Sequence, residues 1–453
     1  MQQSGFIRVL GRRDVLALAF GAIIGWSWVL LTGQWVQTAG SAGAISAFVV
    51  GGIAMIFIGL TYAELVSAMP LAGGEHVYSH RALGRGVSFI CTWALILAYV
   101  TVVAFEAVAL SSGLAYIVPD FSAGRLWSVA GEDVYLSWVA VSMTTAVLMT
   151  VINVFGVRPA AVVQTIVTAI IFLTGVLFVT GTFPAGDAAN LEPYFVDGID
   201  GTLAVLIMVP MMFIGFDVIP QAAEEIRLPF RAIGLLLILS VGMALGWYVL
   251  MILGVALTFP PDALEGLSMA TADAGAAAWE GRWAGNLMVI GGIAGILTSW
   301  NAFLVGGSRA VYAMAKDGLL PRWLADMHPR FHTPWKAVLL IGGFSVAAPL
   351  FGRQILVWLI DAGGFAVIIA YGIVALSFIV LRRREPELER PFRAPGGMFT
   401  GVVALILCVG LLLVYLPGSP AALKWPWEWG ICLGWSLLGL GFYVWAGRQN
   451  SDC

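Results

Sequence analysis

Long apolar stretches separated by short polar connections dominate the hydrophobic pattern of this chain. Because an α-helix needs about 20 consecutive apolar residues to cross a bilayer, we count twelve candidate spans. They lie near residues 15–39, 41–67, 86–118, 136–156, 160–182, 201–224, 232–258, 284–315, 336–351, 355–381, 398–417 and 428–447. The pattern therefore predicts an all-α integral membrane protein with twelve transmembrane helices.

Composition supports this class and argues against several functions. Of the 453 residues, 60% are hydrophobic and only 11% are charged, against roughly 25% charged in soluble domains. The four cysteines show no paired spacing, so neither a disulfide framework nor a zinc site is indicated. The sequence contains no GxxxxGK[ST] phosphate loop and no nucleophile–base motif. We expect neither an enzyme nor an ATP-driven pump, and no cofactor.

Basic residues predict the orientation of the chain. With the N-terminus inside, nineteen of the 23 Lys and Arg residues fall on the cytoplasmic side, as the positive-inside rule requires. Both termini are then cytoplasmic, and a plasma (cytoplasmic) membrane location follows. The longest outer connection, residues 260–282, is rich in Ala and Gly and is predicted to hold a short surface helix.

The first span carries glycines where a simple membrane anchor would carry leucines. Its segment GAIIGWSWVLLTG contains Gly21, Gly25 and Gly33. Glycine lets a helix unwind, and unpaired backbone groups at membrane depth are tolerated where they line a cavity. Close helix packing through small residues is the alternative interpretation.

The sixth span is interrupted in a similar way, which favours the first interpretation. Its sequence contains Pro210, Gly215 and Pro220, with Asp217 between the last two. Proline removes a helical N–H group and clashes with the preceding turn. Two broken helices at corresponding positions of two halves are typical of a transporter site at the midplane.

Several sequence motifs resemble those of a known family. They are the first-span glycine segment and four further stretches: YAELVSAMPLAGGEHVYSHRALG, MMFIGFDVIPQAAEEIRLPFR, GGSRAVYAMAKDGLLPRWLADMHPRFHTP and LRRREPELERPFRAPGG. In these the chain resembles amino acid–polyamine–organocation (APC) superfamily permeases, and the resemblance covers nearly its whole length. It implies the leucine-transporter-type fold, with a 5+5 inverted repeat, broken helices 1 and 6 and two C-terminal helices.

The resemblance implies a division of the chain and a function. The expected parts are a cytoplasmic N-terminus (1–14), a first repeat (15–182), a second repeat (201–381), helices 11 and 12 (398–447) and a cytoplasmic tail (448–453). We expect a secondary transporter that moves an amino acid or related organic amine by alternating access. The expected partners are this small molecule and the lipid bilayer, with no nucleic acid. A polyamine or organocation carrier is the alternative, and a channel or nutrient receptor on the same scaffold is a third.

The backbone of the first break is the predicted carboxylate site. Free N–H groups at Gly25, Trp26 and Ser27, next to Ile24, suit a carboxylate, and carbonyls near Phe213–Gly215 suit an ammonium group. Many family members carry a small residue where Trp26 stands. Its indole could pack away from the site, reduce the pocket, or stack on a cationic substrate.

Two aromatic and two acidic residues complete the predicted substrate site. Phe213 and Phe216 flank the second break, either as a thin gate or as core packing. Glu106 lies deep in the third span, and intramembrane carboxylates are by default functional hypotheses. We expect it to bind the substrate amine or carry a proton. Asp217 has the same candidate roles, or it caps the broken helix.

The coupling ion is left open. In sodium-coupled members of this fold, first-helix carbonyls and an eighth-helix hydroxyl pair hold the ion. Here Gly21 and Ile24 would supply carbonyls, and Thr298 and Ser299 the hydroxyls, with Gly295 one turn earlier. Some proton-coupled relatives use a fifth-helix lysine, which is absent from residues 159–180. Sodium, proton coupling and ion-free exchange are all retained, and Thr298 and Ser299 could instead bond to their own helix.

Overall fold

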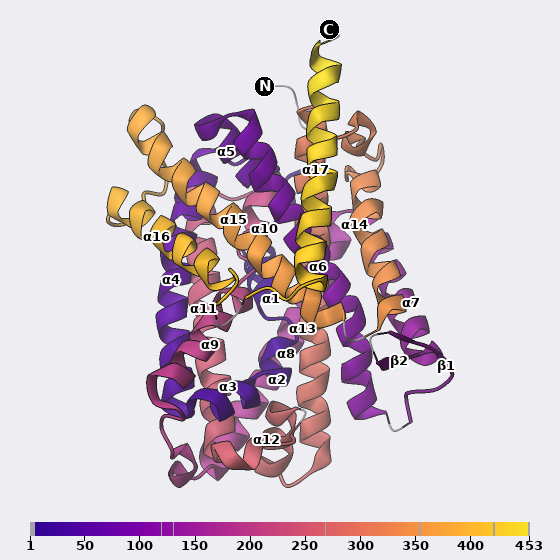
Figure 1. Cartoon of the computed structure of the whole chain (residues 1–453), viewed down its shortest axis with the longest axis vertical. Helices are drawn as coiled ribbons and strands as arrows, with labels where there is room; N and C mark the ends of the chain where they lie inside the picture. Colours follow the sequence, from indigo (N-terminus) through magenta and orange to yellow (C-terminus); the bar gives the residue numbers. More distant parts are fainter. Residues whose placement is uncertain are drawn as a thin grey trace.

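The computed structural model describes residues 5–118, 120–129, 131–267, 269–352, 355–419 and 422–451, and most of them are helical. Residues 1–4 and 452–453 of the two predicted cytoplasmic ends lie outside this range. The helices form an elongated bundle with both termini at one end and α12 at the other (Figure 1). The helices are α1 (Arg12–Ile23), α2 (Ser27–Leu30), α3 (Thr32–Ala39), α4 (Ser41–Ala68), α5 (Glu75–Leu83), α6 (Arg85–Ile117), α7 (Leu136–Val154), α8 (Val157–Ala185), α9 (Gly198–Met212), α10 (Val218–Gln221), α11 (Phe230–Thr258), α12 (Ala270–Ala278), α13 (Arg282–Lys316), α14 (Trp335–Ala347), α15 (Ile355–Arg384), α16 (Met398–Val414) and α17 (Trp427–Ser451).

Eight of the described helices are long and apolar enough to cross a membrane: α4, α6, α7, α8, α11, α13, α15 and α17. Three shorter apolar helices cover 198–212, 335–351 and 398–414. The remaining predicted span, residues 15–39, is divided among α1, α2 and α3. This pattern indicates a multi-pass integral membrane protein.

Both predicted interruptions are present. The first lies between the end of α1 at Ile23 and the start of α2 at Ser27, and the second between Met212 and Val218. Gly215 adopts φ +130°, a backbone conformation that residues with a side chain rarely take. A Cβ there would lie 2.7 Å from the carbonyl carbon of Ala22. The two breaks therefore touch each other, which places them in one site.

Glycine also brings α13 against the first break. A Cβ on Gly295 would lie 2.3 Å from the carbonyl oxygen of Gly25, so no larger residue fits there without a shift. Most side chains of α13 between Ala284 and Ala315 are buried. This helix therefore forms the wall behind the broken α1–α2 segment.

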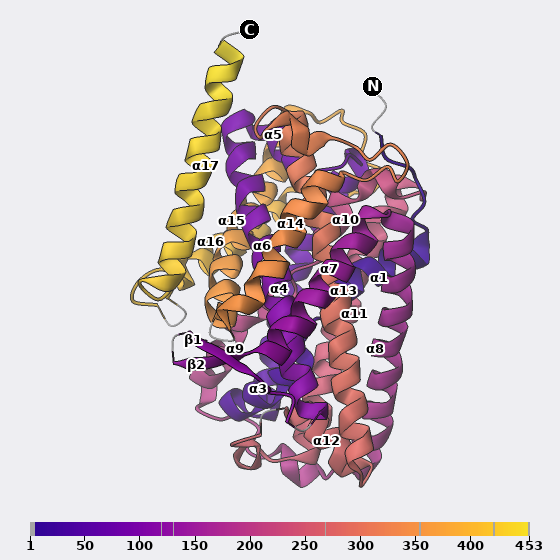
Figure 2. The same cartoon turned by 90° about the vertical axis from the view of Figure 1, so that its right-hand side faces the viewer.

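Two connections differ from the sequence-based expectation. The connection after α6 folds into an antiparallel hairpin of β1 (Arg125–Val129) and β2 (Glu132–Tyr135), which projects at the side of the bundle (Figure 2). The predicted short surface helix in 260–282 exists as α12 at the end of the bundle, but one of its faces is buried. Its Thr271 is fully buried and donates a hydrogen bond to the Trp28 carbonyl at 2.8 Å. An alanine-rich helix is compatible with a buried position as well as with an exposed one, so the composition does not distinguish them.

The end of the bundle that carries the termini is tightly closed. The N–H groups of Val9 and Leu10 both donate to the carbonyl of Glu225 at 2.9 Å. The carboxylate of Glu225 in turn accepts from Arg309 Nε at 2.7 Å, and both side chains are buried. The N-terminal segment, the turn after α10 and α13 are thus joined through one residue.

Candidate substrate site at the two helix breaks

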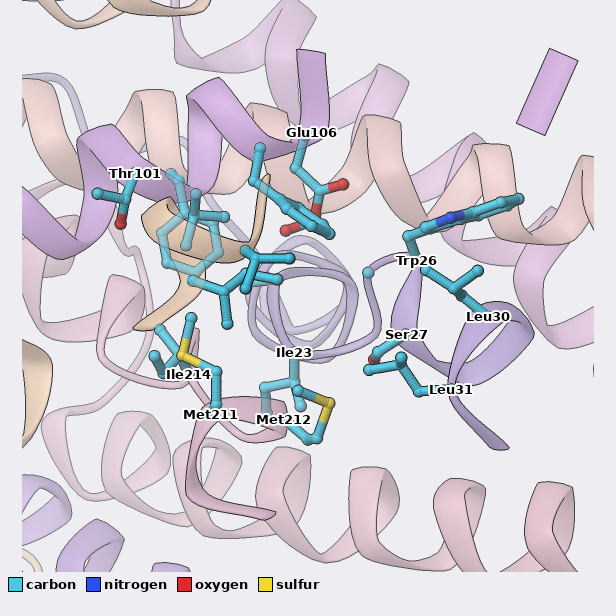
Figure 3. Close-up of a pocket in the computed structure, with 18 of the residues that line it drawn as sticks. Ile23, Trp26, Ser27, Leu30, Leu31, Thr101, Glu106, Met211, Met212 and Ile214 are labelled. Atoms are coloured by element: carbon cyan, nitrogen blue, oxygen red, sulfur yellow. The ribbon is translucent and has the colours of Figure 1, made fainter. Parts of the chain in front are cut away.

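A cavity of about 300 Å³ lies beside the first break (Figure 3). Its wall comes from α1, α2, α6, the end of α9 and α13, and it extends to β2 and the start of α15. Most of the lining is apolar. The lining residues are Ala22, Ile23, Gly25, Trp26, Ser27, Leu30, Leu31, Thr101, Val102, Phe105, Glu106, Glu132, Met211, Met212, Ile214, Ser299, Phe303, Val357 and Ile360.

The backbone of the first break offers fewer donors than predicted. The N–H of Gly25 already donates to the carbonyl of Ile23 at 3.2 Å. The N–H groups at the start of the four-residue α2 cannot be paired within that helix. Trp26 and Ser27 therefore remain the candidate carboxylate donors, and both line the cavity. Ile24 does not line it.

Tyr248 of α11 joins the two breaks. Its hydroxyl lies 3.3 Å from the carbonyl of Ile23 at the end of α1 and 3.1 Å from the carbonyl of Met212 at the end of α9. It also lies 3.1 Å from Ser27 Oγ. Because the last carbonyls of a helix have no partner within it, the one proton of this hydroxyl is shared between two carbonyls that the breaks expose. The sequence analysis missed Tyr248, a polar residue in an otherwise apolar run.

Glu106 faces the first break. Its side chain is 2% exposed, and Oε2 has no hydrogen-bond partner among the described residues. Oε1 lies 2.8 Å from where a Cβ on Gly25 would be, so the absence of a side chain at position 25 admits the carboxylate. Ser299 hydrogen-bonds to this carboxylate, but a buried carboxylate oxygen that is left without a partner is still costly. The arrangement favours a ligand that brings a hydrogen-bond donor or a positive charge.

The carboxylate of Asp217 is hydrogen-bonded to other groups of the protein, and the residue does not line the cavity. Its Oδ1 accepts hydrogen bonds from the N–H of Gly215 and from the Tyr371 hydroxyl, both at 2.9 Å. The hydroxyl of Tyr99 donates to Oδ2. The contacts are those of the capping role considered for this residue, because they fix the backbone turn at Gly215.

The other second-break residues are part of the packed core in this structure. Phe213 and Phe216 are fully buried and absent from the cavity lining, as is Gly215. Phe216 packs 5.3 Å from the ring of Tyr371. Ile214, which the sequence analysis did not name, is the residue of this turn that lines the cavity.

The predicted ion ligands face two different surroundings. Ser299 lines the cavity, whereas Thr298 packs against Gly21 and donates to the carbonyl of Gly295 on its own helix at 2.9 Å. Gln164 of α8 also lies against Gly21, and its Nε2 donates to the carbonyl of Ala17 at 3.1 Å. The space beside Gly21 is therefore filled by an amide that the sequence analysis missed.

The cavity is closed toward the termini and extends toward the loops at the other end. Along α6, Tyr99 precedes the cavity residues Thr101 and Glu106, so the Asp217 cluster lies on the side of the termini. The buried Arg309–Glu225 pair lies further in that direction. On the opposite side the lining includes Glu132 of the hairpin.

Comparisons with known proteins agree along the whole length of the chain. The profile of a family described as amino acid permease matches residues 10–438. The branched-chain amino acid permease BcaP of Bacillus subtilis is 29% identical over 98% of this chain and 94% of its own. The methylthioribose transporter of the same organism is 26% identical with the same coverage. The vacuolar cationic amino acid transporter 4 of Arabidopsis thaliana is 28% identical over 83% of this chain and 63% of its own.

Proposed function

Because the chain belongs to the amino acid permease family, we propose that it is a secondary transporter that moves an amino acid or a related organic amine by alternating access. The proposal includes twelve membrane crossings built on a 5+5 inverted repeat, with α1–α2 and α9–α10 as the broken helices of the leucine-transporter-type fold. It also includes a location in the cytoplasmic membrane, with both termini inside.

The buried carboxylate of Glu106 beside a broken helix, whose Oε2 has no partner among the described residues, carries the proposal. In the proposed pose the substrate amine lies against Glu106, and the substrate carboxylate accepts from the N–H groups of Trp26 and Ser27. A helix start suits a carboxylate because its N–H groups are unpaired and its dipole end is positive. The side chain of the substrate then contacts apolar residues such as Met212 and Ile214.

The closed and open sides of the cavity support alternating access. The cavity reaches the hairpin end, while the Arg309–Glu225 pair closes the end that carries the termini. With the termini inside, as proposed, this arrangement fits a state that is open or occluded toward the outside. Entry of substrate and release on the inside then require the α1 and α10 halves to move away from α13.

For coupling, we favour a proton or exchange over sodium. A sodium site needs oxygen ligands that are free to turn toward the ion. The space beside Gly21, where the ion would lie, is instead occupied by the side chains of Gln164 and Thr298. Glu106 is the proposed proton-accepting group, since it is buried in the cavity and its Oε2 is unpaired.

A carrier of polyamines or other organic cations is the second candidate. The ionisable residues in the described cavity lining, Glu106 and Glu132, are both acidic, and such a wall favours positive solutes. A diamine would place one nitrogen at each carboxylate, whereas an amino acid uses only the deeper one.

Uptake into proteoliposomes tests both candidates. The panel contains neutral and cationic amino acids, diamines and methylthioribose, each under a sodium gradient, a proton gradient or neither. Saturable amino acid uptake with counterflow supports the first candidate and excludes a channel. Glu106→Gln should abolish this uptake, while Glu132→Gln, the matched control, should retain it. Uptake confined to diamines would replace the first candidate by the second.

A further inference from the structure

Trp26 fills a slot between two helices that glycine creates. A Cβ on Gly292 of α13 would lie 2.4 Å from Cζ3 of the indole, and a Cβ on Gly113 of α6 would lie 3.0 Å from Cη2. The indole is 1% exposed. Figure 3 shows it extending away from Met211 and Met212, which line another part of the wall. The indole therefore penetrates between α6 and α13 because neither helix has a side chain at the point of entry.

The slot adjoins the substrate site. Trp26 follows Gly25, whose backbone faces Glu106, and both residues line the cavity. Without the indole, the space between Gly113 and Gly292 would be continuous with the cavity. The filled slot therefore lies next to the proposed contacts of the substrate amine and carboxylate. The substrate side chain would leave its Cα atom close to this slot.

The remaining cavity is small. Its volume of about 300 Å³ is at the lower end of the roughly 300–1,000 Å³ typical of ligand pockets. Much of the rest of the wall is bulky, with Leu30, Phe105 and Phe303 among its residues. A substrate side chain that is directed from the first break toward α6 and α13 therefore meets the indole in the slot.

The indole is held in the slot by packing rather than by hydrogen bonding. Its Nε1 has no partner among the described residues. Shortening this side chain therefore removes a buried unpaired donor and leaves no other group without its partner. That makes position 26 a place where the pocket can be enlarged without breaking a polar network.

We propose that Trp26 is a size filter that restricts the site to amino acids with small apolar side chains. This inference rests on the proposed function, because it concerns the same site. The indole occupies the volume that a larger substrate side chain would need, and the two glycines on α6 and α13 keep it there.

The test compares uptake of alanine, valine, leucine and phenylalanine by proteoliposomes that contain wild type, Trp26→Ala or Trp26→Phe. The wild type should prefer alanine. One methylene in an apolar pocket changes kcat/KM about 10–200-fold, so the leucine-to-alanine ratio of kcat/KM should rise at least about 10-fold in Trp26→Ala and less in Trp26→Phe. Trp28→Phe is the matched control, because Trp28 is buried in the same segment, packs on Trp247 and does not line the cavity. It should leave the ratio unchanged.

A second variant tests the slot from its other side. Gly292→Ala places a methyl group against the ring and should push the indole into the cavity, which lowers alanine uptake at least about 10-fold. Adding Trp26→Ala to Gly292→Ala should restore it, whereas adding Val29→Ala, which relieves the other contact of the new methyl group at 2.7 Å, should not. Size-exclusion profiles identify variants that fail to fold. A folded Trp26→Ala with the wild-type ratio, a wild type that prefers leucine, or a double variant of Trp26→Ala and Gly292→Ala that is not restored would overturn the size filter. A wild type that accumulates no amino acid would instead refute the proposed function.

Discussion

The hydrogen bonds around Asp217 allow a quantitative test of its capping role. Its carboxylate accepts from the N–H of Gly215 and from the hydroxyls of Tyr371 and Tyr99, and the residue is fully buried. Asp217→Asn keeps the shape but replaces one acceptor oxygen by an NH₂ group. Tyr371→Phe removes one donor and leaves the carboxylate in place.

The expected losses follow from hydrogen-bond energies. A bond to a charged group contributes about 1.5–3 kcal/mol, and a neutral one about 0.5–1.5 kcal/mol. Weakening three such bonds by about 1 kcal/mol each destabilises Asp217→Asn by about 3 kcal/mol. Tyr371→Phe should lose about 1.5–3 kcal/mol. The two changes should be non-additive by about 0.5–3 kcal/mol, since the residues are in contact.

The free energy of unfolding can be measured in mixed micelles titrated with a denaturing detergent, followed by tryptophan fluorescence. Tyr62→Phe is the matched control. Tyr62 is fully buried and its ring lies 5.6 Å from that of Tyr371, but its hydroxyl bonds to Glu75 and makes no bond to Asp217. Tyr62→Phe should therefore keep the hydrogen bonds of Asp217 and lose less stability than Tyr371→Phe.

Substrate affinity separates a cap from a binding residue. Because Asp217 does not line the cavity, Tyr371→Phe should keep the wild-type substrate Kd while it loses stability. The reasoning is refuted if Asp217→Asn abolishes binding with an unchanged free energy of unfolding, or if Tyr371→Phe and Tyr62→Phe are equally stable.

Three further predictions concern other parts of the chain. Tyr248→Phe removes the one O–H donor that lies between the exposed carbonyls of the two helix ends and should cost about 1–3 kcal/mol of unfolding free energy; an unchanged unfolding midpoint would contradict this. The hydrogen bond from His76, the largest cause, holds the pKa of Asp317 below its ordinary value. The contribution of the ionised Asp317 carboxylate to stability is therefore present above the ordinary pKa of about 4 and is lost as pH falls through the lowered pKa. On the acid side, the unfolding midpoint should depend less steeply on pH in Asp317→Asn than in wild type. Equal slopes in the two proteins would contradict the proposed link between this carboxylate and stability. Gln164→Leu should lower the free energy of unfolding. Because the Gln164 amide fills the space beside α1, replacement of sodium by choline should leave uptake by the wild type unchanged, and uptake that requires sodium would contradict this interpretation.

The sequence could predict where the helices break because the cause is local. Gly25 and Gly215 act on their own backbone, so the glycine and proline pattern indicates both interruptions without knowledge of the neighbours. The same holds for the long apolar runs, since hydrophobic length alone decides whether a helix can cross a bilayer.

The composition of the cavity wall could not be predicted because it depends on which way each side chain faces. Thr298 and Ser299 are adjacent hydroxyl residues in sequence, yet one faces Gly21 and the other the cavity. Tyr248 lies 221 residues from Ser27, and nothing in its apolar run distinguishes a lipid-facing hydroxyl from one at the breaks. Trp26 had three open interpretations, because the glycines that receive its ring belong to two distant helices.

The attachment of Val9 and Leu10 to the carbonyl of Glu225 joins the beginning of the chain to the turn after α10. A fusion partner placed before this segment would put a load on that attachment. A tag on the protruding end of α17 avoids that load. A fluorescent dye attached near Arg8 would, for the same reason, report a separation of this segment from Glu225.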